Sequence, residues 1–235
     1  MGSRRSFLVT MIAAAAVAST ATPADAASSH LVAAWEMNEP AGSRTMADSS
    51  GNGLRGAIGG EVGTGVHVRG VAGYRFSKLE PDYPPPHPRH LVTVRDTADL
   101  DPGDRDYAVT VRLRTTYQFG NIIQKGQATV NGGNFKLQIP NGIVQCLFRG
   151  SDGQVIVSAH RSINDGWWHT VRCDRTESRL TLTVDDSEVA YRSGRTGWIA
   201  NSWPLSIGGK TSCDQIDVGC DYYAGDIDYV VIDAG

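Results

Sequence analysis

The sequence is poor in the features of nucleic-acid-binding and membrane-spanning proteins. Its 235 residues carry a formal net charge of −3, and no cluster of lysine or arginine follows the first few positions. This charge pattern would recruit neither nucleic acid nor an anionic membrane surface. Beyond the N-terminal segment, no stretch approaches the roughly 20 apolar residues that a membrane helix needs. We therefore expect no nucleic-acid partner and no insertion into a membrane.

Several catalytic motifs are missing as well. The sequence contains no Gly-x-Ser-x-Gly nucleophile elbow and no Gly-x-x-x-x-Gly-Lys-Ser/Thr phosphate loop. No two glutamates are spaced two or four residues apart. A single strand therefore cannot bring a glutamate pair into a cleft, as retaining glycanases on β-sandwich folds require. These absences argue against nucleotide-dependent enzymes and common hydrolases.

The N-terminal segment has the composition of an export signal. SRRSFLV at 3–9 is followed by an apolar run at 11–18 and by small residues at 24–26 that suit signal peptidase. We predict a signal peptide over residues 1–26, cleaved at its end. The arginine pair resembles a twin-arginine signal, and an ordinary secretory signal is the alternative. Residues 27–235 are then expected to form one secreted, monomeric domain.

The four cysteines do not have the spacing of a zinc site. Cys146, Cys173, Cys213 and Cys220 contain no Cys-x-x-Cys pair. Cysteines of exported proteins more often form disulfides, so we expect two disulfides and no zinc. Cys213 and Cys220 enclose a short segment and should pair with each other. Cys146 and Cys173 should form the other bond if both face the core from neighbouring strands.

What the sequence does contain is a period-two alternation of apolar and polar residues, which predicts half-buried strands. Glycine-rich turns separate these segments. After the signal, no window of about eleven residues has helical periodicity. The pattern predicts an all-β fold, a two-sheet antiparallel β-sandwich. The proline-rich segment 79–90 should be a surface loop. The clearest predicted strands are 31–35, 107–115, 142–148, 154–160, 168–173 and 179–184.

The stretch DGWWHTVRCDR at 165–175 contains adjacent tryptophans beside a histidine. In a strand, alternation would place Trp167, His169 and Cys173 on one face and Trp168 on the other. We predict that His169 points inward as a hydrogen-bonded core residue rather than a catalytic base. Trp168 should point away from that layer, onto the second sheet surface or under a loop.

Several segments, in this order, resemble laminin-G-like, concanavalin A-like domains of bacterial secreted proteins. The resemblance covers roughly residues 31–233 and implies two packed, curved antiparallel sheets in a jelly roll, with the chain ends close together. The segments that carry it are HLVAAWEMNEPAGSRTMADSSGNGLRGAI, HLVTVRDTADLDPGDRDYAVTVRLRTT, NIIQKG, DGWWHTVRCDR, LTLTVDD, LSIGGK and YYAGDIDYVVI.

The resembled fold hosts lectins, glycanases, lyases and adhesive modules, so it does not fix the function. We expect a secreted, non-catalytic module that binds a polysaccharide, a cell-surface glycan or another extracellular surface. One alternative is a small glycoside hydrolase or polysaccharide lyase that uses Asp226, Asp228 or Arg112 with His160. In the resembled family, however, the aspartate pair lies in the closing strand, and Arg112 and Arg114 are expected to form a solvated strand face. A further alternative is an adhesive module without a small ligand.

Candidate site residues follow from side-chain chemistry. Aromatic side chains in or beside turns can stack on a sugar ring, and the candidates are Tyr83, Tyr117, Trp198 and Trp203.

Calcium is the one cofactor that the sequence suggests. Asp48 and Asn52 in the SSGNG turn offer hard oxygen ligands, and Asp228 could join them if the first and last strands are neighbours. Alternatively, Asp48 and Asn52 only cap the backbone of their own turn.

Overall fold

The structure is a computed structural model that describes residues 29–80, 86–213 and 220–235. The predicted signal peptide at 1–26 and the predicted ligand residue Tyr83 therefore lie outside the described residues. Within the described part, no helix is long and apolar enough to cross a membrane.

Strands make up half of the described residues, as the alternation leads one to expect of a β-sandwich. The only helical elements within the described part are two short 3-10 turns, η1 (Pro88–His90) and η2 (Ala98–Leu100). The strands are β1 (His30–Trp35), β2 (Thr45–Met46), β3 (Gly56–Ile58), β4 (Gly63–Val68), β5 (Val71–Phe76), β6 (Val92–Val94), β7 (Tyr107–Arg114), β8 (Gly120–Lys125), β9 (Asn134–Ile139), β10 (Ile143–Gly150), β11 (Gly153–Ser162), β12 (Trp168–Arg175), β13 (Arg179–Val184), β14 (Ser187–Ser193), β15 (Leu205–Ile207) and β16 (Gly225–Ala234).

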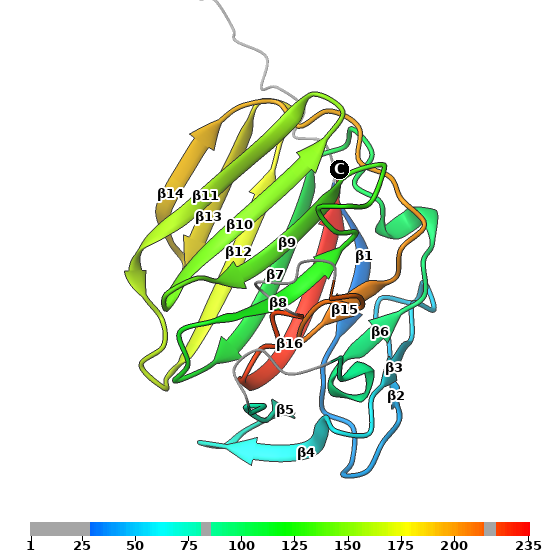
Figure 1. Ribbon diagram of the computed structural model, residues 1–235, viewed down its shortest axis with the longest axis vertical. Coiled ribbons are helices and arrows are strands. Elements are labelled where there is room, and N and C mark those ends of the chain that lie inside the picture. The colour runs from blue at the N-terminus through cyan, green and yellow to red at the C-terminus, as the bar shows by residue number, and fades with distance from the viewer. Residues whose placement is uncertain (1–28, 81–85, 214–219) are drawn as a thin grey trace, which may run out of the picture.

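The strands form two antiparallel sheets that stack as a sandwich (Figure 1). The first sheet has the order β14-β13-β12-β7-β16-β5-β4, and β1 also pairs with β16. The second sheet has the order β11-β10-β9-β8-β15-β6-β3-β2. The all-β, two-sheet antiparallel sandwich predicted from the sequence is confirmed.

Alternation along each central strand separates the core from the outer surface. In β7, Val109, Val111 and Leu113 are buried, whereas Arg112 and Arg114 lie on the outer face of the first sheet. The core-facing residues of β10, across the sandwich, are Val144, Cys146 and Phe148. Both sheets thus contribute one apolar face to a single core, because side chains alternate with a period of two along a strand.

The two predicted disulfides are present. Cys213 bonds to Cys220, and Cys146 bonds to Cys173 with their Cα atoms 6.3 Å apart. The expectation that Cys146 and Cys173 lie on neighbouring strands was wrong. Cys146 lies in β10 of the second sheet and Cys173 in β12 of the first, so the bond crosses the core between the sheets. Both cysteines do face the core, as the alternation predicted.

The sandwich has two ends that can be named from strand register. His30 pairs with Ala234, so the first and last strands are neighbours. We call the end that contains these residues the terminal end, and the opposite end, where β7 finishes at Arg114, the distal end. The β10–β11 turn at Gly150–Gly153 belongs to the terminal end, because Ser151 hydrogen bonds to the loop that follows β14.

Candidate functional site

The predicted ligand aromatics do not form one site. Tyr117 follows β7 at the distal end, whereas Trp198 and Trp203 lie in the loop between β14 and β15 at the terminal end. The eight residues of β7 separate the two ends, a length of roughly 25 Å at about 3.3 Å per residue. Each end must therefore be assessed by itself.

At the distal end, two loops present exposed aromatic rings. Loop 115–119 is joined to loop 163–167 by a 2.9 Å hydrogen bond from Gly166 N to Thr115 O. Tyr117 and Phe119 lie in the first loop and Trp167 in the second, and they are 39%, 42% and 57% exposed. We call Tyr117, Phe119 and Trp167 the distal aromatic rim. Large apolar side chains so exposed on adjacent loops are typical of binding surfaces.

Trp167 does not follow the predicted strand parity. It was expected inward with His169, but β12 begins only at Trp168. Gly166 has a positive φ of 80°, and Asp165 accepts a 2.8 Å hydrogen bond from Trp167 N. This turn carries Trp167 out of the strand, so alternation does not apply to it. The guanidinium of Arg69, in the β4–β5 turn, stacks 3.9 Å from the centre of the Trp167 ring.

Trp168 packs as predicted. It points away from the core and is half-buried, and its Nε1 donates a 3.3 Å hydrogen bond to the carbonyl of Val68, the last residue of β4 before the β4–β5 turn. Trp168 thus lies under a loop and serves packing.

His169 points inward, as predicted, and is buried close to the distal loops. Its Nδ1 lies 2.8 Å from Asp185 and its Nε2 lies 3.1 Å from Asp165. Burial alone would lower the pKa of His169, but the hydrogen bonds and charges of the two carboxylates outweigh it and raise the pKa. The histidine thus joins the loop that carries Trp167 to the β13–β14 turn.

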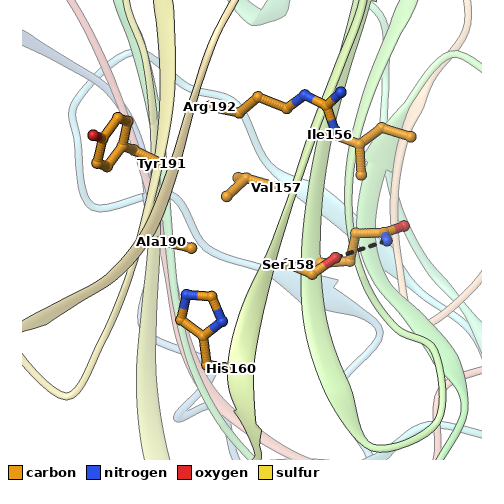
Figure 2. Close-up of a pocket in the computed structure, with 8 residues that line it drawn as sticks. Ile156, Val157, Ser158, His160, Ala190, Tyr191 and Arg192 are labelled. Carbon is orange, nitrogen blue, oxygen red and sulfur yellow. Dashed lines mark hydrogen bonds between the residues drawn. The ribbon is translucent and has the colours of Figure 1, made fainter.

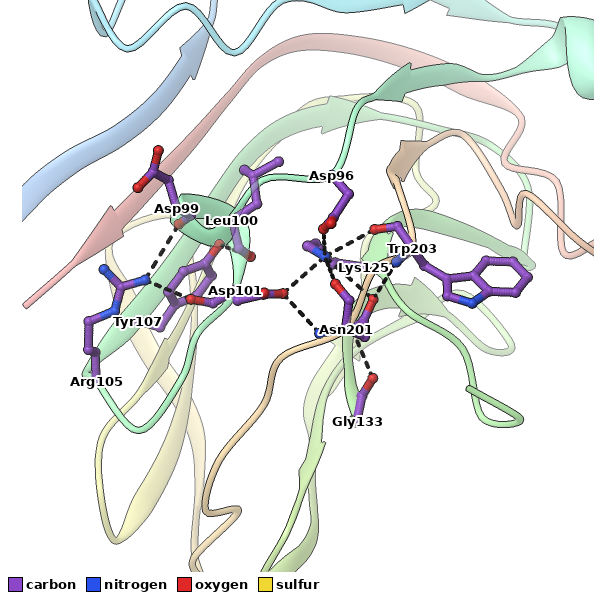
Figure 3. A network of polar contacts seen from close by, with 10 residues as sticks. All are labelled: Asp96, Asp99, Leu100, Asp101, Arg105, Tyr107, Lys125, Gly133, Asn201 and Trp203. Carbon is purple, nitrogen blue, oxygen red and sulfur yellow. Dashed lines mark hydrogen bonds and ion pairs between the residues drawn. The ribbon is translucent and has the colours of Figure 1, made fainter. Parts of the chain in front are cut away.

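At the terminal end, a buried lysine holds the loop that carries both predicted tryptophans. Lys125 has no exposed side-chain surface and pairs with Asp96 at 2.7 Å and Asp101 at 3.0 Å. Its Nζ also donates to the carbonyls of Asn201 and Trp203 at 2.8 and 3.0 Å (Figure 3). These contacts satisfy the buried ammonium and fix the loop against β8.

The two terminal tryptophans differ in exposure. Trp203 is half-buried, whereas Trp198 is 56% exposed. The backbone of Trp198 is anchored, because its N–H bonds Ser151 Oγ at 2.9 Å and its carbonyl accepts from Ser151 N at 3.0 Å. Of the two, only Trp198 presents an open ring.

The aspartates of the enzyme alternative are paired with arginines. Asp226 has a 3% exposed side chain and bonds Arg75 at 2.7 Å and Arg114 at 2.8 Å. Asp228 bonds Arg112 at 2.8 Å. Arg112 and Arg114 are therefore part of an ion-paired, half-buried surface rather than the freely solvated face expected from the sequence.

The proposed pairing of Arg112 with His160 does not occur. Arg112 lies on the outer face of the first sheet, and His160 is exposed on β11, the edge strand of the second sheet, whose Val155, Val157 and Ala159 face the core. The core separates the two side chains, so they cannot act on one substrate group.

The predicted metal ligands are engaged with protein groups. Asp48 accepts hydrogen bonds from the N–H groups of Ala34, Ser50 and Leu54 and from the Ser50 hydroxyl. These bonds lower the pKa of Asp48 even though burial acts in the opposite direction. The Asn52 amide donates to the Leu31 and Val32 carbonyls.

Within the described residues, no group of three or more His, Cys, Asp or Glu side chains is placed to share a metal ion. Asp228 is held by Arg112 rather than by the Asp48 turn. Calcium binding by Asp48, Asn52 and Asp228 stays a prediction. Calorimetric titration of chelator-treated protein with calcium tests it. If calcium produces no heat and no rise in melting temperature, the site is rejected.

Comparison with known proteins identifies the family. The laminin G domain family matches residues 113–234, which is more than half of the chain. The chain belongs to the laminin G domain family. The laminin-G-like resemblance predicted from the sequence is thereby confirmed.

Individual relatives of this laminin G domain are distant. Mouse laminin subunit alpha-1 is 28% identical over 110 residues, 44% of this chain and 4% of that subunit. The binding domain of Paraclostridial Mosquitocidal Protein 1 has a TM-score of 0.60 at 11% identity and covers 87% of this chain and 48% of its own.

A third relative matches along nearly its whole length. Domain 4 of AbnA, a GH43 extracellular arabinanase from Geobacillus stearothermophilus, was solved in complex with arabinotriose. It has a TM-score of 0.59 at 14% identity and covers 88% of this chain and 93% of its own. This likeness and that to the mosquitocidal protein show the fold. The chain spans less than two thirds of the laminin subunit and of the mosquitocidal protein structure.

The residues that match the laminin G domain family include the distal aromatic rim. Residues 113–234 include both loops of the distal aromatic rim, the terminal tryptophans and the ion-paired aspartates. The Asp48 turn lies outside the matched residues.

Proposed function

We propose that this laminin G domain is a secreted, non-catalytic binding module that recognises a glycan through the distal aromatic rim. The observation that carries the proposal is the exposure of Tyr117, Phe119 and Trp167 on two hydrogen-bonded loops. A sugar ring lays its C–H face on an aromatic side chain, and polar loop groups bind its hydroxyls. The mosquitocidal protein relative, which is described as a binding domain, and the relative solved with arabinotriose support a binding role.

The distal loops have the rigidity that such recognition favours. His169, Asp165 and Asp185 fix the loop that carries Trp167, and the Arg69 guanidinium covers part of its ring. A ring held in this way loses little conformational freedom on binding, which favours affinity. Polar groups beside the rim include Thr116, Gln118 and Asn141, which are exposed.

A glycan array with the full chain, expressed with export, tests the proposal. We expect binding to at least one polysaccharide class and a loss of about tenfold or more in affinity for Trp167→Ala. Trp198→Ala is the matched control, since Trp198 is 56% exposed at the terminal end and Trp167 is 57% exposed at the distal end.

The outcomes separate the two ends of the sandwich. If Trp198→Ala loses binding and Trp167→Ala keeps it, the terminal end is the site and the rim assignment is wrong. If the array is silent for the unmodified chain, glycan recognition is rejected as a whole.

A further inference from the structure

Both ring nitrogens of His169 lie within hydrogen-bond distance of a carboxylate. Nδ1 is 2.8 Å from Asp185 Oδ2, and Nε2 is 3.1 Å from Asp165 Oδ1. An ionised carboxylate can only accept a hydrogen bond, and a neutral imidazole has a single N–H to donate. Both contacts are hydrogen bonds only when the ring carries two protons, so the geometry is that of an imidazolium.

The charges around the ring favour this protonated form. Although burial opposes it, the hydrogen bonds and charges of Asp185 and Asp165 raise the pKa of His169. Burial also acts to raise the pKa of Asp165, but the hydrogen bonds from Trp167 N and His169 outweigh it and lower that pKa. Asp165 is therefore ionised throughout the range in which the ring titrates.

The two carboxylates differ in how firmly the rest of the chain holds them. Asp185 also accepts from Thr170 N at 3.0 Å and pairs with Arg161 at 3.1 Å, so it keeps its place without the imidazolium. The side chain of Asp165 is 52% exposed, and its other bond is to Trp167 N, two residues along the same loop. When the ring loses one proton, we expect the other to stay on Nδ1, facing Asp185. The bare Nε2 then repels the Asp165 carboxylate.

Asp165 lies at the base of Trp167 in the distal aromatic rim. Its Oδ1 accepts both from Trp167 N at 2.8 Å and from the imidazolium, so one oxygen joins the tryptophan to the ring. The next residue, Gly166, bonds Thr115 O through its N–H and accepts from Arg114 Nε at 2.7 Å. These contacts do not depend on the imidazolium. We therefore expect the Trp167 loop to loosen, rather than to unfold, when the ring is neutral.

We propose that His169 is a pH-sensitive latch of the distal aromatic rim, so that the rim binds its ligand most tightly in mildly acidic solution and less tightly as the ring loses its proton. His169 is a positioning residue, because Trp167 and not the imidazole would touch the ligand. The binding part of this proposal rests on the proposed function. The latch itself rests on the contacts of the ring.

Hydrogen exchange tests the latch in the full chain without any ligand. Amide exchange in residues 163–167 is compared between the unmodified protein and His169→Gln at about pH 5.5 and about pH 8.5. The effect of pH on the intrinsic exchange rate is common to both proteins and cancels. We expect the unmodified protein to be the better protected at the lower pH and the difference to vanish at the higher pH.

Affinity measured at the same two pH values tests the binding part. The probes are dextran, xylan and galactan, neutral polysaccharides that carry no titrating group of their own. We expect the unmodified protein to bind about threefold or more weakly at the higher pH, because a smaller fraction of the molecules then holds the loop in the binding conformation. His169→Gln should bind equally at both pH values, with the weaker affinity.

A second variant removes the charge instead of the ring. Asp165→Asn keeps an oxygen that accepts from Trp167 N but lacks the negative charge that binds the imidazolium. It should lose the pH dependence of exchange and of affinity, as His169→Gln does. Melting temperatures verify that each variant is folded.

His160→Gln is the matched control. His160 is exposed on β11, next in the chain to Arg161, and makes no hydrogen bond or ion pair with the described residues. Figure 2 shows its ring between β11 and β14, toward Ala190, where it lines the cleft between these two edge strands. Removing this imidazole should leave the pH dependence of the unmodified protein unchanged.

The outcomes distinguish the latch from the proposed function. A pH dependence that is lost in His169→Gln and kept in His160→Gln supports the proposal. Equal affinity of the unmodified protein at both pH values, or a pH dependence that survives in His169→Gln, overturns it. If the glycan array is silent and none of the three polysaccharides binds, the proposed function fails together with the binding part. Loop exchange then decides the latch alone, and exchange that does not depend on His169 rejects it.

Discussion

Asp185 accepts a 2.8 Å hydrogen bond from His169 and so ties the β13–β14 turn to the start of β12. The other oxygen of the same carboxylate accepts from Thr170 N at 3.0 Å, and Arg161 approaches Asp185 to 3.1 Å. Asp165, which lies two residues before Trp167 in the chain, hydrogen bonds to the second ring nitrogen of His169. The order of the distal loops is therefore linked to the protonation of one imidazole.

This link predicts a pH dependence of stability. Because the folded protein raises the pKa of His169, protonated His169 stabilises the fold most below the ordinary histidine pKa of about 6.5. The contribution is lost as the pH rises through the raised value. In urea titrations, the difference in unfolding free energy between the unmodified protein and His169→Gln should be largest in mildly acidic solution and shrink above neutrality.

The same comparison controls for the other histidines. Burial lowers the pKa of His90, which acts with the opposite sign, but His90 is unchanged in both proteins and cancels in the difference. His67→Gln alters an exposed histidine. Its curve of unfolding free energy against pH should run parallel to that of the unmodified protein. Parallel curves for His169→Gln as well would show that the carboxylates do not hold a protonated ring.

A second prediction concerns the buried lysine of the terminal end. Lys125→Met removes the cation and leaves Asp96 and Asp101 without their partner. The unfolding free energy should fall by about 3 kcal/mol, since breaking a buried ion pair from one side leaves an uncompensated charge. Urea denaturation measures the loss.

The surface pair of Lys78 and Glu80 provides the comparison for Lys125. Lys78→Met should cost less than about 1 kcal/mol, because exposed ion pairs contribute little. Similar losses in the two lysine variants would mean that the Lys125 cluster adds no more than an ordinary surface contact.

Alternation along the chain predicted which face a residue occupies, but not which strand it faces. It placed Cys146, Cys173 and His169 inward, because a strand repeats every two residues. It could not assign Cys146 and Cys173 to different sheets, since core-facing positions of both sheets carry the same apolar pattern. The pairing of Cys146 with Cys173 was predicted correctly, but the position of the bond between the two sheets was not.

The site was harder to predict because its residues lie where the alternation breaks. Trp167 lies outside the strand, because the Gly166 turn with its positive φ of 80° precedes β12, which begins at Trp168. Tyr117 was identified from its position beside a turn, and its partner loop is 46 residues further on, from residue 163. Only the fold brings such loops together.

The last prediction separates structure from catalysis at Asp226 and Asp228. Asp226→Asn leaves Arg75 and Arg114 without the carboxylate that both bind, and should lower the unfolding free energy by about 3 kcal/mol. Asp228→Asn is the matched variant. Burial, only partly offset by Arg112, raises the pKa of Asp228. Its charge is therefore less favourable in the fold, and its removal should cost less than about 1 kcal/mol.

Reducing-end release from polysaccharides, measured on the same two variants, tests the enzyme alternative. If Asp226 and Asp228 are only structural, Asp226→Asn lowers the unfolding free energy and the unmodified protein releases no reducing ends. The reason is that arginines bind the carboxylate oxygens that would act on a glycosidic bond. Turnover by the unmodified protein that disappears in Asp228→Asn, a variant expected to remain stable, would instead show that the carboxylate takes part in chemistry. That result would replace the non-catalytic proposal with a hydrolase acting from the outer face of the first sheet.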